Sequence, residues 1–247
     1  MLLTRPSGRG DAWQTPLEAA GAVVLSHPTI AVEPPESWAP LDEALARLDG
    51  YAWVVFTSAA AVEFCASRWP ASHPPQGLGR PRIAAVGPAT AAALSARGFS
   101  VAMVPEDQRQ EGLLAGLSVL PPGTAVLFPQ AVGGRSTLAG ALGKRGIVVD
   151  VVPASRTVAR RNLPSPPPFD VVVFASPSAF EAFRSNHGTA LLEGRVTIAI
   201  GPTTASALSA AGVVATVAGG PTVDGVIAAI AAHWPGLPST SGPAESR

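Results

Sequence analysis

Cysteine and lysine are almost absent from this chain of 247 residues, and only 14% of its residues are charged. The single cysteine, Cys65, excludes an internal disulfide and any metal site built from several thiolates. We expect it to be a small buried residue on a helix. Lys144 is the one lysine, the 17 basic residues balance 17 acidic ones, and no stretch concentrates one sign. Neither a nucleic acid nor a membrane surface is therefore an expected partner.

Long apolar runs are also missing, although 47% of the residues are hydrophobic. No run approaches the roughly 18 apolar residues that span a bilayer. The residues before Arg5 are too few for the apolar core of a signal peptide. We therefore expect a cytoplasmic protein whose apolar residues fill the cores of two domains.

The motifs of several common chemistries are missing as well. The sequence has no Gly-rich phosphate loop with its lysine, no two-histidine metal spacing and no Ser-His-Asp order at strand ends. The four histidines are scattered through loops and termini, so we expect surface positions for His27, His73, His187 and His233. The sequence predicts no metal site, and it disfavours a nucleotide-using transferase.

What the sequence does contain is a repeat. Residues 85–98 and 199–212 are identical at ten of fourteen positions. Each copy reads as an apolar strand, a Gly-Pro turn, a hydroxyl residue at a helix start and an Ala/Leu helix closed by glycine. A weaker similarity relates residues 2–24 to residues 127–149 at a constant offset. The repeats indicate two similar α/β lobes, one of them permuted relative to the other.

Alternating apolar and helical segments place the expected elements. We expect strands at residues 2–4, 22–25, 53–56, 83–86, 101–104, 125–128, 147–152, 171–174, 197–200 and 213–217. We expect helices at residues 15–20, 41–48, 59–67, 90–97, 112–117 and 136–145, after Ser178, after Thr203, and at 223–233. The fold class is α/β, with two flavodoxin-like lobes of five parallel strands each.

Proline-rich segments mark the boundaries of these lobes. The outer, discontinuous lobe takes residues 1–30 and 160–235, and the central lobe takes 38–152. Residues 31–37 and 153–159 are linkers that together form a two-stranded hinge, and the tail 236–247 is expected to be disordered.

Hydroxyl residues follow several of these strands, at the edge where parallel α/β sheets bind ligands. They are candidates for substrate contact: Thr57, Ser58, Thr90, Ser176, Ser178, Thr203 and Thr204. Arg5 and Arg135, which follow the matched strands of the two lobes, add guanidinium groups. Serine and threonine are also the preferred helix N-caps, so each hydroxyl has a purely structural alternative. The doubling in Thr203-Thr204 and in Ser176/Ser178 favours ligand contact, because one cap needs one hydroxyl.

An ordered set of segments carries a family resemblance. These segments are residues 2–6, residues 54–58 with Val62 and Phe64, residues 85–90, and residues 199–204. The chain resembles uroporphyrinogen-III synthase over about residues 1–234. The resemblance implies a cofactor-independent lyase that closes the linear tetrapyrrole hydroxymethylbilane, inverts its last pyrrole ring and releases water. It also implies an eight-carboxylate substrate in haem, sirohaem and cobalamin biosynthesis.

One position departs from the family pattern. Family members commonly have a tyrosine in the second linker, where this chain has Ser155. A serine is shorter than a phenol and a much weaker acid, so the catalytic residues stay unassigned. We expect a monomeric uroporphyrinogen-III synthase, and a non-catalytic two-lobe protein that binds tetrapyrroles or other small molecules is the alternative.

Overall fold

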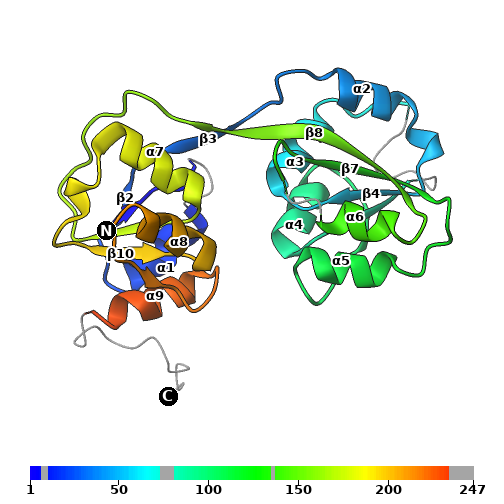
Figure 1. Cartoon of the computed structure of the whole chain (residues 1–247). Coiled ribbons are helices and arrows are strands. Elements are labelled where there is room, and N and C mark those ends of the chain that lie inside the picture. The colour runs from blue at the N-terminus through cyan, green and yellow to red at the C-terminus, as the bar shows by residue number, and fades with distance from the viewer. Residues whose placement is uncertain (7–10, 73–80, 135–136, 234–247) are drawn as a thin grey trace, which may run out of the picture. The chain divides into compact units, whose positions relative to one another are not determined.

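The computed structural model describes residues 1–6, 11–72, 81–134 and 137–233 (Figure 1). The chain forms two compact units. Unit 1 contains Met1–Ala31 and the chain from Val158 onward, and unit 2 contains Val32–Thr157. Both are α/β units built on parallel strands, and Arg135 and the predicted tail 236–247 lie outside the described residues.

Unit 1 is built on a five-stranded parallel sheet with the order β11-β10-β9-β1-β2. Its strands are β1 (Leu2–Leu3), β2 (Leu25–Ser26), β9 (Val171–Phe174), β10 (Val196–Ala199) and β11 (Thr216–Val217). Its helices are α1 (Asp11–Ala19), α7 (Pro177–His187), α8 (Pro202–Ala210) and α9 (Val223–Ala231), with a 3-10 turn at Ala190–Leu192. Leu2 pairs with Leu25 on one side and with Val172 on the other, so β1 is an inner strand.

The two faces of this sheet have separate apolar cores. On one face, Phe180 and Phe183 of α7 and Leu208 of α8 pack against strand residues such as Phe174. On the other face, residues of α1 and α9 such as Leu17 pack against other strand residues, including Val173. The strands are near-continuous apolar runs because both of their faces are buried.

Unit 2 is built on a six-stranded sheet with the order β3-β8-β7-β4-β5-β6. Its strands are β3 (Ile30–Glu33), β4 (Trp53–Phe56), β5 (Arg82–Ala85), β6 (Val101–Met103), β7 (Ala125–Ala131) and β8 (Val148–Ala159). Its helices are α2 (Ala39–Ala46), α3 (Ala59–Ala66), α4 (Pro88–Ala96), α5 (Gln110–Leu117) and α6 (Thr137–Gly143), with a 3-10 turn at Leu48–Gly50. Helices α2, α3 and α4 cover one face, and α5 and α6 cover the other.

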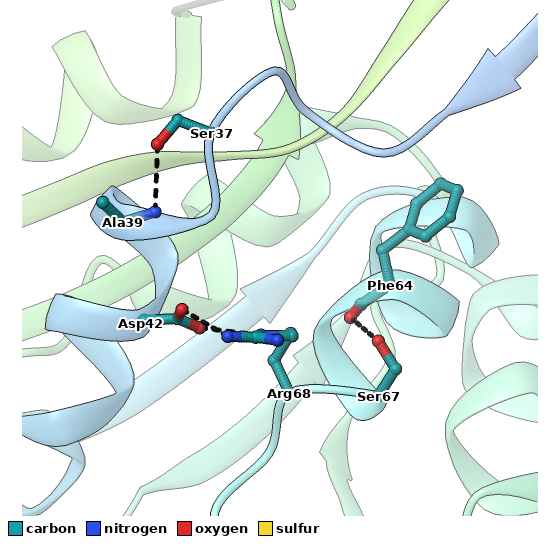
Figure 2. Close-up of polar contacts among 6 residues, drawn as sticks. All are labelled: Ser37, Ala39, Asp42, Phe64, Ser67 and Arg68. Carbon is teal, nitrogen blue, oxygen red and sulfur yellow. Dashed lines mark hydrogen bonds and ion pairs between the residues drawn. The ribbon is translucent and has the colours of Figure 1, made fainter.

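An exposed ion pair connects α2 to the turn that follows α3 (Figure 2). The Arg68 guanidinium donates to both carboxylate oxygens of Asp42, and its Nε lies 2.8 Å from Oδ1. The same guanidinium lies over the ring of Trp38, 5.5 Å from its centroid. A serine lies at the start of α2 and another at the end of α3. Ala39 N–H donates to Ser37 Oγ at 3.2 Å, and Ser67 Oγ donates to the carbonyl of Phe64 in α3 at 2.7 Å.

The structure confirms the internal repeat. Helices α4 and α8, which begin in the two similar segments, both follow an inner strand of their sheet and both start with proline after an N-cap glycine. The weaker similarity is also structural, because β1, α1 and β2 correspond to β7, α6 and β8. When these elements are matched, the two sheets have the same strand order, apart from the additional strand β3 in unit 2.

The expectation of five strands in each lobe is wrong for unit 2, whose sheet has six because β3 joins it. Several strands also differ from the expected ranges, among them β2, β7, β8 and β11. Strand β8 does not stop at Val152 but continues to Ala159, through the whole of the predicted second linker at 153–159. Pro153 is tolerated there because the register with β7 shifts beside it, and prolines inside sheets occur at such irregularities. Strand β2 begins at Leu25, three residues later than expected, and Val23 before it is 75% exposed.

Cys65 lies on α3 and is fully buried, as expected for a small apolar residue. Burial raises the pKa of its thiol to about 12, so the thiol stays protonated at neutral pH. Among the described residues, none of the helices is both long and apolar enough to cross a membrane.

Candidate functional site

The carboxyl ends of the strands in each unit are followed by helix N-termini, and two of these helices are capped by serine. Ser58 Oγ accepts a hydrogen bond from Ala61 N–H at 3.1 Å at the start of α3. Ser176 Oγ accepts one from Ala179 N–H at 3.1 Å at the start of α7. Both serines thus act as helix N-caps, which is the purely structural role expected as the alternative to ligand contact. A capping oxygen still carries its own O–H proton, so each hydroxyl remains able to donate to a ligand.

The two repeated helices begin differently. The N-cap residues of α4 and α8 are Gly87 and Gly201, which are in extended conformation and provide no side-chain cap. Proline follows each glycine, so the first helical position has no N–H group. The remaining amides of the first turn carry the partial positive charge of the helix dipole, and no side chain accepts a hydrogen bond from them as a cap. Each unit therefore has, at α4 or α8, a helix N-terminus without a side-chain cap at the carboxyl edge of its sheet, where an anionic group can bind.

The other predicted hydroxyls differ in exposure. Thr90 and Thr204 occupy equivalent positions in the first turns of α4 and α8, and both are buried, with 5% and 3% of their surface exposed. Thr203 and Ser178 are exposed, and Thr57 is half-buried. Direct contact with a ligand from solvent is thus easiest for Thr203 and Ser178.

Arg5 follows β1 and lies against Trp13 of α1. Its guanidinium carbon is 4.3 Å from the centroid of the indole ring. This stacking on a ring that is itself 9% exposed fixes the direction of the guanidinium at the carboxyl edge of unit 1. The matching Arg135 of unit 2 lies outside the described residues.

Sequence reasoning missed two glutamines at the carboxyl edge of unit 2. Gln108 lies against Gly87, since its Oε1 would be 3.4 Å from a Cβ built on that glycine. Gln130 is the penultimate residue of β7, and its Oε1 would be 2.9 Å from a Cβ built on Gly134. No local pattern distinguishes these glutamines, because only the sheet order brings β5, β6 and β7 to one edge.

Neither Ser155 nor Tyr51 offers an accessible phenol as a proton donor. Ser155, at the family's tyrosine position, lies in β8 and is 1% exposed. Tyr51 is the single tyrosine of the chain, and its hydroxyl donates to Asp150 Oδ2. Burial and the Asp150 carboxylate raise the pKa of Tyr51 to about 12. This phenol precedes β4, at the amino edge of the sheet, away from the helix N-termini.

The prediction of surface positions for the histidines is wrong for His27. It is 7% exposed, and its Nε2 lies 3.0 Å from Nε2 of His187, which is half-buried at the end of α7. His233 is exposed and bonds Thr216 Oγ1 through Nε2 at 2.8 Å, and His73 lies outside the described residues. His27 is buried because the segment after β2 folds back over α7, a tertiary contact that has no local signature.

An open pocket of about 530 Å³ lies at the opposite edge of unit 1. Its lining includes Phe169 and Asp170, which precede β9, and Glu193 and Arg195, which precede β10. The Arg195 guanidinium is held there by the carbonyl of Phe169 at 3.0 Å. This pocket is therefore separate from the candidate residues at the strands' carboxyl ends.

These features define the class of the protein. It has two α/β units whose sheets share a strand order. In each unit, a helix N-terminus without a side-chain cap lies at the carboxyl edge of the sheet, where its partial positive charge attracts anions. The model of the family described as uroporphyrinogen-III synthase HemD matches residues 11–228, which covers most of both units. The chain belongs to the uroporphyrinogen-III synthase family.

Individual relatives agree with this assignment. A uroporphyrinogen-III synthase of Synechococcus elongatus is 34% identical over 165 residues, which cover 66% of this chain and 62% of that protein. The match thus spans less than two thirds of that relative. A protein of Methanothermobacter thermautotrophicus is 32% identical over 257 aligned positions, covering 94% of this chain and 97% of its own length.

Solved structures share the fold. The uroporphyrinogen-III synthetase of Helicobacter pylori superposes with a TM-score of 0.61 at 21% identity, covering 86% of this chain and 93% of that one. A mutant uroporphyrinogen III synthase from the extremely thermophilic bacterium Thermus thermophilus gives a TM-score of 0.55 at 21% identity, covering 92% and 94%.

Proposed function

We propose that this protein is an active uroporphyrinogen-III synthase, a cofactor-independent lyase that converts hydroxymethylbilane into the type III macrocycle. The observation that carries the proposal is the family match over residues 11–228, which includes both repeated helix starts. The reaction releases the terminal hydroxyl group as water and inverts the last pyrrole ring during closure.

The chemistry asks the protein mainly to orient its substrate. The electron-rich pyrrole expels the hydroxyl group of the hydroxymethyl carbon, which takes up a proton and departs as water, and this carbon becomes an electrophilic azafulvenium centre. Uncatalysed closure then joins this carbon to the unsubstituted position of the terminal ring, whereas the type III product requires attack at its substituted position, which gives a spirocyclic intermediate. The bond from the substituted position to its original methylene bridge then breaks, and the freed methylene joins the unsubstituted position with loss of a proton, which inverts the ring. Holding the bilane in one conformation selects between these two carbons.

The eight carboxylates of the bilane give the protein its means of holding it. We propose that the amides at the starts of α4 and α8 bind carboxylates, because neither helix has a side-chain cap. The hydroxyls and guanidinium groups proposed to assist are those of Thr57, Ser58, Thr90, Ser176, Ser178, Thr203, Thr204, Arg5 and Arg135. Amides and hydroxyls as the main donors suit a chain whose 17 basic residues are balanced by 17 acidic ones.

We further propose that water supplies the proton that leaves with the hydroxyl group. Ser155 is buried and is a weak acid, and Tyr51 is bonded to Asp150. A protein without a dedicated phenol depends on substrate orientation for its selectivity more than on acid catalysis.

The remaining proposals concern architecture and setting. We propose that each sheet is of the flavodoxin-like type, and that β3 and β8, which are neighbours in the sheet of unit 2, act as a hinge. Residues 1–30 with 160–235 and residues 38–152 are the proposed lobes, and 31–37 and 153–159 the proposed linkers. We also propose a cytoplasmic monomer that binds no nucleic acid.

The test is the isomer composition of the product. Purified protein is incubated with hydroxymethylbilane, the macrocycles are oxidised to porphyrins, and isomers I and III are separated by chromatography. Predominant isomer III supports the proposal. Isomer I alone, at the rate of the protein-free reaction, would favour the alternative of a non-catalytic tetrapyrrole-binding protein.

A further inference from the structure

His27 and His187 are 160 residues apart in the chain, but their side chains meet in unit 1. His27 directly follows β2, and His187 is the last residue of α7. The two Nε2 atoms are 3.0 Å apart, and the ring centroids are separated by 5.1 Å at an interplanar angle of 46°. The same ring atom of both imidazoles therefore points toward a common location.

The surroundings hold both rings in this arrangement. The ring of Phe183 makes edge contacts with His27 and His187, at centroid distances of 6.4 and 5.0 Å. The segment after His27 is fixed to α7, because Thr29 Oγ1 donates to the carbonyl of Ala179 at 2.8 Å. His27 is almost fully buried, whereas half-buried His187 leaves the pair reachable from solvent.

The electrostatic environment keeps the imidazoles uncharged at neutral pH. Burial lowers the pKa of both histidines, and the charges of His187 and Arg160 lower the pKa of His27 further. A neutral imidazole carries its proton on either ring nitrogen, and in the ion-free pair one Nε2–H donates to the other Nε2 at 3.0 Å. When both protons are on Nδ1, the two Nε2 lone pairs are free to face the same ion.

The separation of the two Nε2 atoms fits a shared metal ion. Zinc–imidazole bonds are about 2.0–2.1 Å long, so two ligands at right angles are about 2.9 Å apart and two tetrahedral ligands about 3.4 Å apart. We propose that His27 and His187 chelate one late transition-metal cation, Zn²⁺, Ni²⁺ or Cu²⁺, through their Nε2 atoms. Imidazole nitrogen suits these ions, whereas Mg²⁺ and Ca²⁺ require oxygen ligands.

The site is a weak and exchangeable one. Within the described residues there is no group of three or more histidine, cysteine, aspartate or glutamate side chains suited to hold a metal, so water completes the coordination. Arg160 is the charged group that acts on His27 besides His187, and its guanidinium is held by the carbonyl of Pro28 at 3.4 Å. Its positive charge opposes a cation, so Arg160→Gln is expected to tighten metal binding.

Isothermal titration of the full-length, tag-free protein with zinc or nickel chloride tests this site. We expect one ion per chain, with a dissociation constant in the micromolar range near pH 7.5 and no binding of magnesium. His27→Gln and His187→Gln are each expected to abolish binding while circular dichroism shows a folded protein. The matched controls His233→Gln and His73→Gln are expected to bind as the unaltered protein does.

Two results would overturn the proposal. One is the absence of binding heat at millimolar zinc and nickel, and the other is unchanged binding in folded His187→Gln protein. Tightening by Arg160→Gln supports the placement of the ion beside His27, and weaker binding in that variant would contradict it. None of these readouts depends on the proposed synthase activity.

Discussion

Gly201 and Ser176 occupy the same position, the N-cap, at two helix starts of unit 1, but only the serine caps its helix. Gly201→Ser adds a hydroxyl acceptor where a built Cβ meets nothing within 4 Å. We expect a fold that is as stable or a few tenths of a kcal/mol more stable, because serine is a better cap than glycine. KM for hydroxymethylbilane is expected to rise roughly tenfold, since the new acceptor competes for amides that would bind a carboxylate. Thermal melts and steady-state kinetics measure the two effects.

The control for this substitution is Gly140→Ser, because that α6 glycine also has open space around it. We expect its kinetics to match those of the unaltered protein. An unchanged KM in Gly201→Ser would contradict a substrate role for the α8 N-terminus.

Ser176 offers a pair of substitutions that separates capping from ligand contact. Ser176→Ala removes the acceptor for Ala179 N–H and is expected to cost about 1 kcal/mol, whereas Ser176→Gly is expected to cost only a few tenths. Both remove the hydroxyl donor, so both should lower kcat/KM by a similar factor if that donor contacts substrate. Full activity in Ser176→Gly, measured per folded molecule, would leave Ser176 with its cap role alone.

Tyr51 permits a direct titration because it is the single tyrosine of the chain. Phenolate absorbance is expected to develop only near pH 12 in the folded protein, since burial and the Asp150 carboxylate disfavour the anion. The raised pKa means that the folded state holds its proton longer than the unfolded chain does. Its contribution to the free energy of unfolding is therefore full below about pH 10 and declines between pH 10 and about 12.

A phenolate midpoint near pH 10 in protein that is still folded would contradict the buried contact. Asp150→Asn is the companion variant, because it keeps the side-chain shape but removes the charge. We expect its Tyr51 pKa to fall below that of the unaltered protein while staying above the ordinary value, since burial is the larger cause.

At the scale of elements, the contact of the segment after β2 with α7 is expected to be acid-sensitive. The pKa values of His27 and His187 are lowered in the fold, so the unfolded chain binds more protons below about pH 6.5. Their stabilising contribution is complete above that pH and is lost as the pH falls. Melting temperatures measured between pH 7.5 and 5 should decline, and the decline should be smaller in His187→Gln than in His233→Gln. Equal slopes in the two variants would contradict the coupling.

The elements that could be predicted from the sequence are those with strong local patterns. Buried strands such as β4 and β9 are uninterrupted apolar runs, and the Gly-Pro starts of α4 and α8 were readable from the repeat alone. The extension of β8 past Pro153 could not be predicted, because it depends on a register shift against β7 that accommodates the proline. The roles of the glutamines and of His27 depend on sheet order and long-range contacts, which no local pattern contains.

At the scale of the whole molecule, each unit is expected to fold without the other. Unit 2 is continuous over residues 32–157, and Arg156 stays bonded within it to Glu33 and Glu36. In unit 1, Arg160 N–H donates to the carbonyl of Thr29 at 2.9 Å, so a short turn is enough to replace the segment between them. We expect both excised units to melt cooperatively, as measured by circular dichroism, and neither alone to form isomer III. A non-cooperative melt of residues 32–157 would contradict the independence of unit 2.

The position of β1 inside the sheet of unit 1 has a consequence for synthesis on the ribosome. Leu2 pairs with Val172, so the first strand emerges about 170 residues before one of its neighbours exists. At about 5–20 residues per second, this strand waits on the order of ten to thirty seconds with an unsatisfied edge. During that interval unit 2 emerges in full and can fold, so the segment that waits for its partner is a short apolar strand rather than a whole domain.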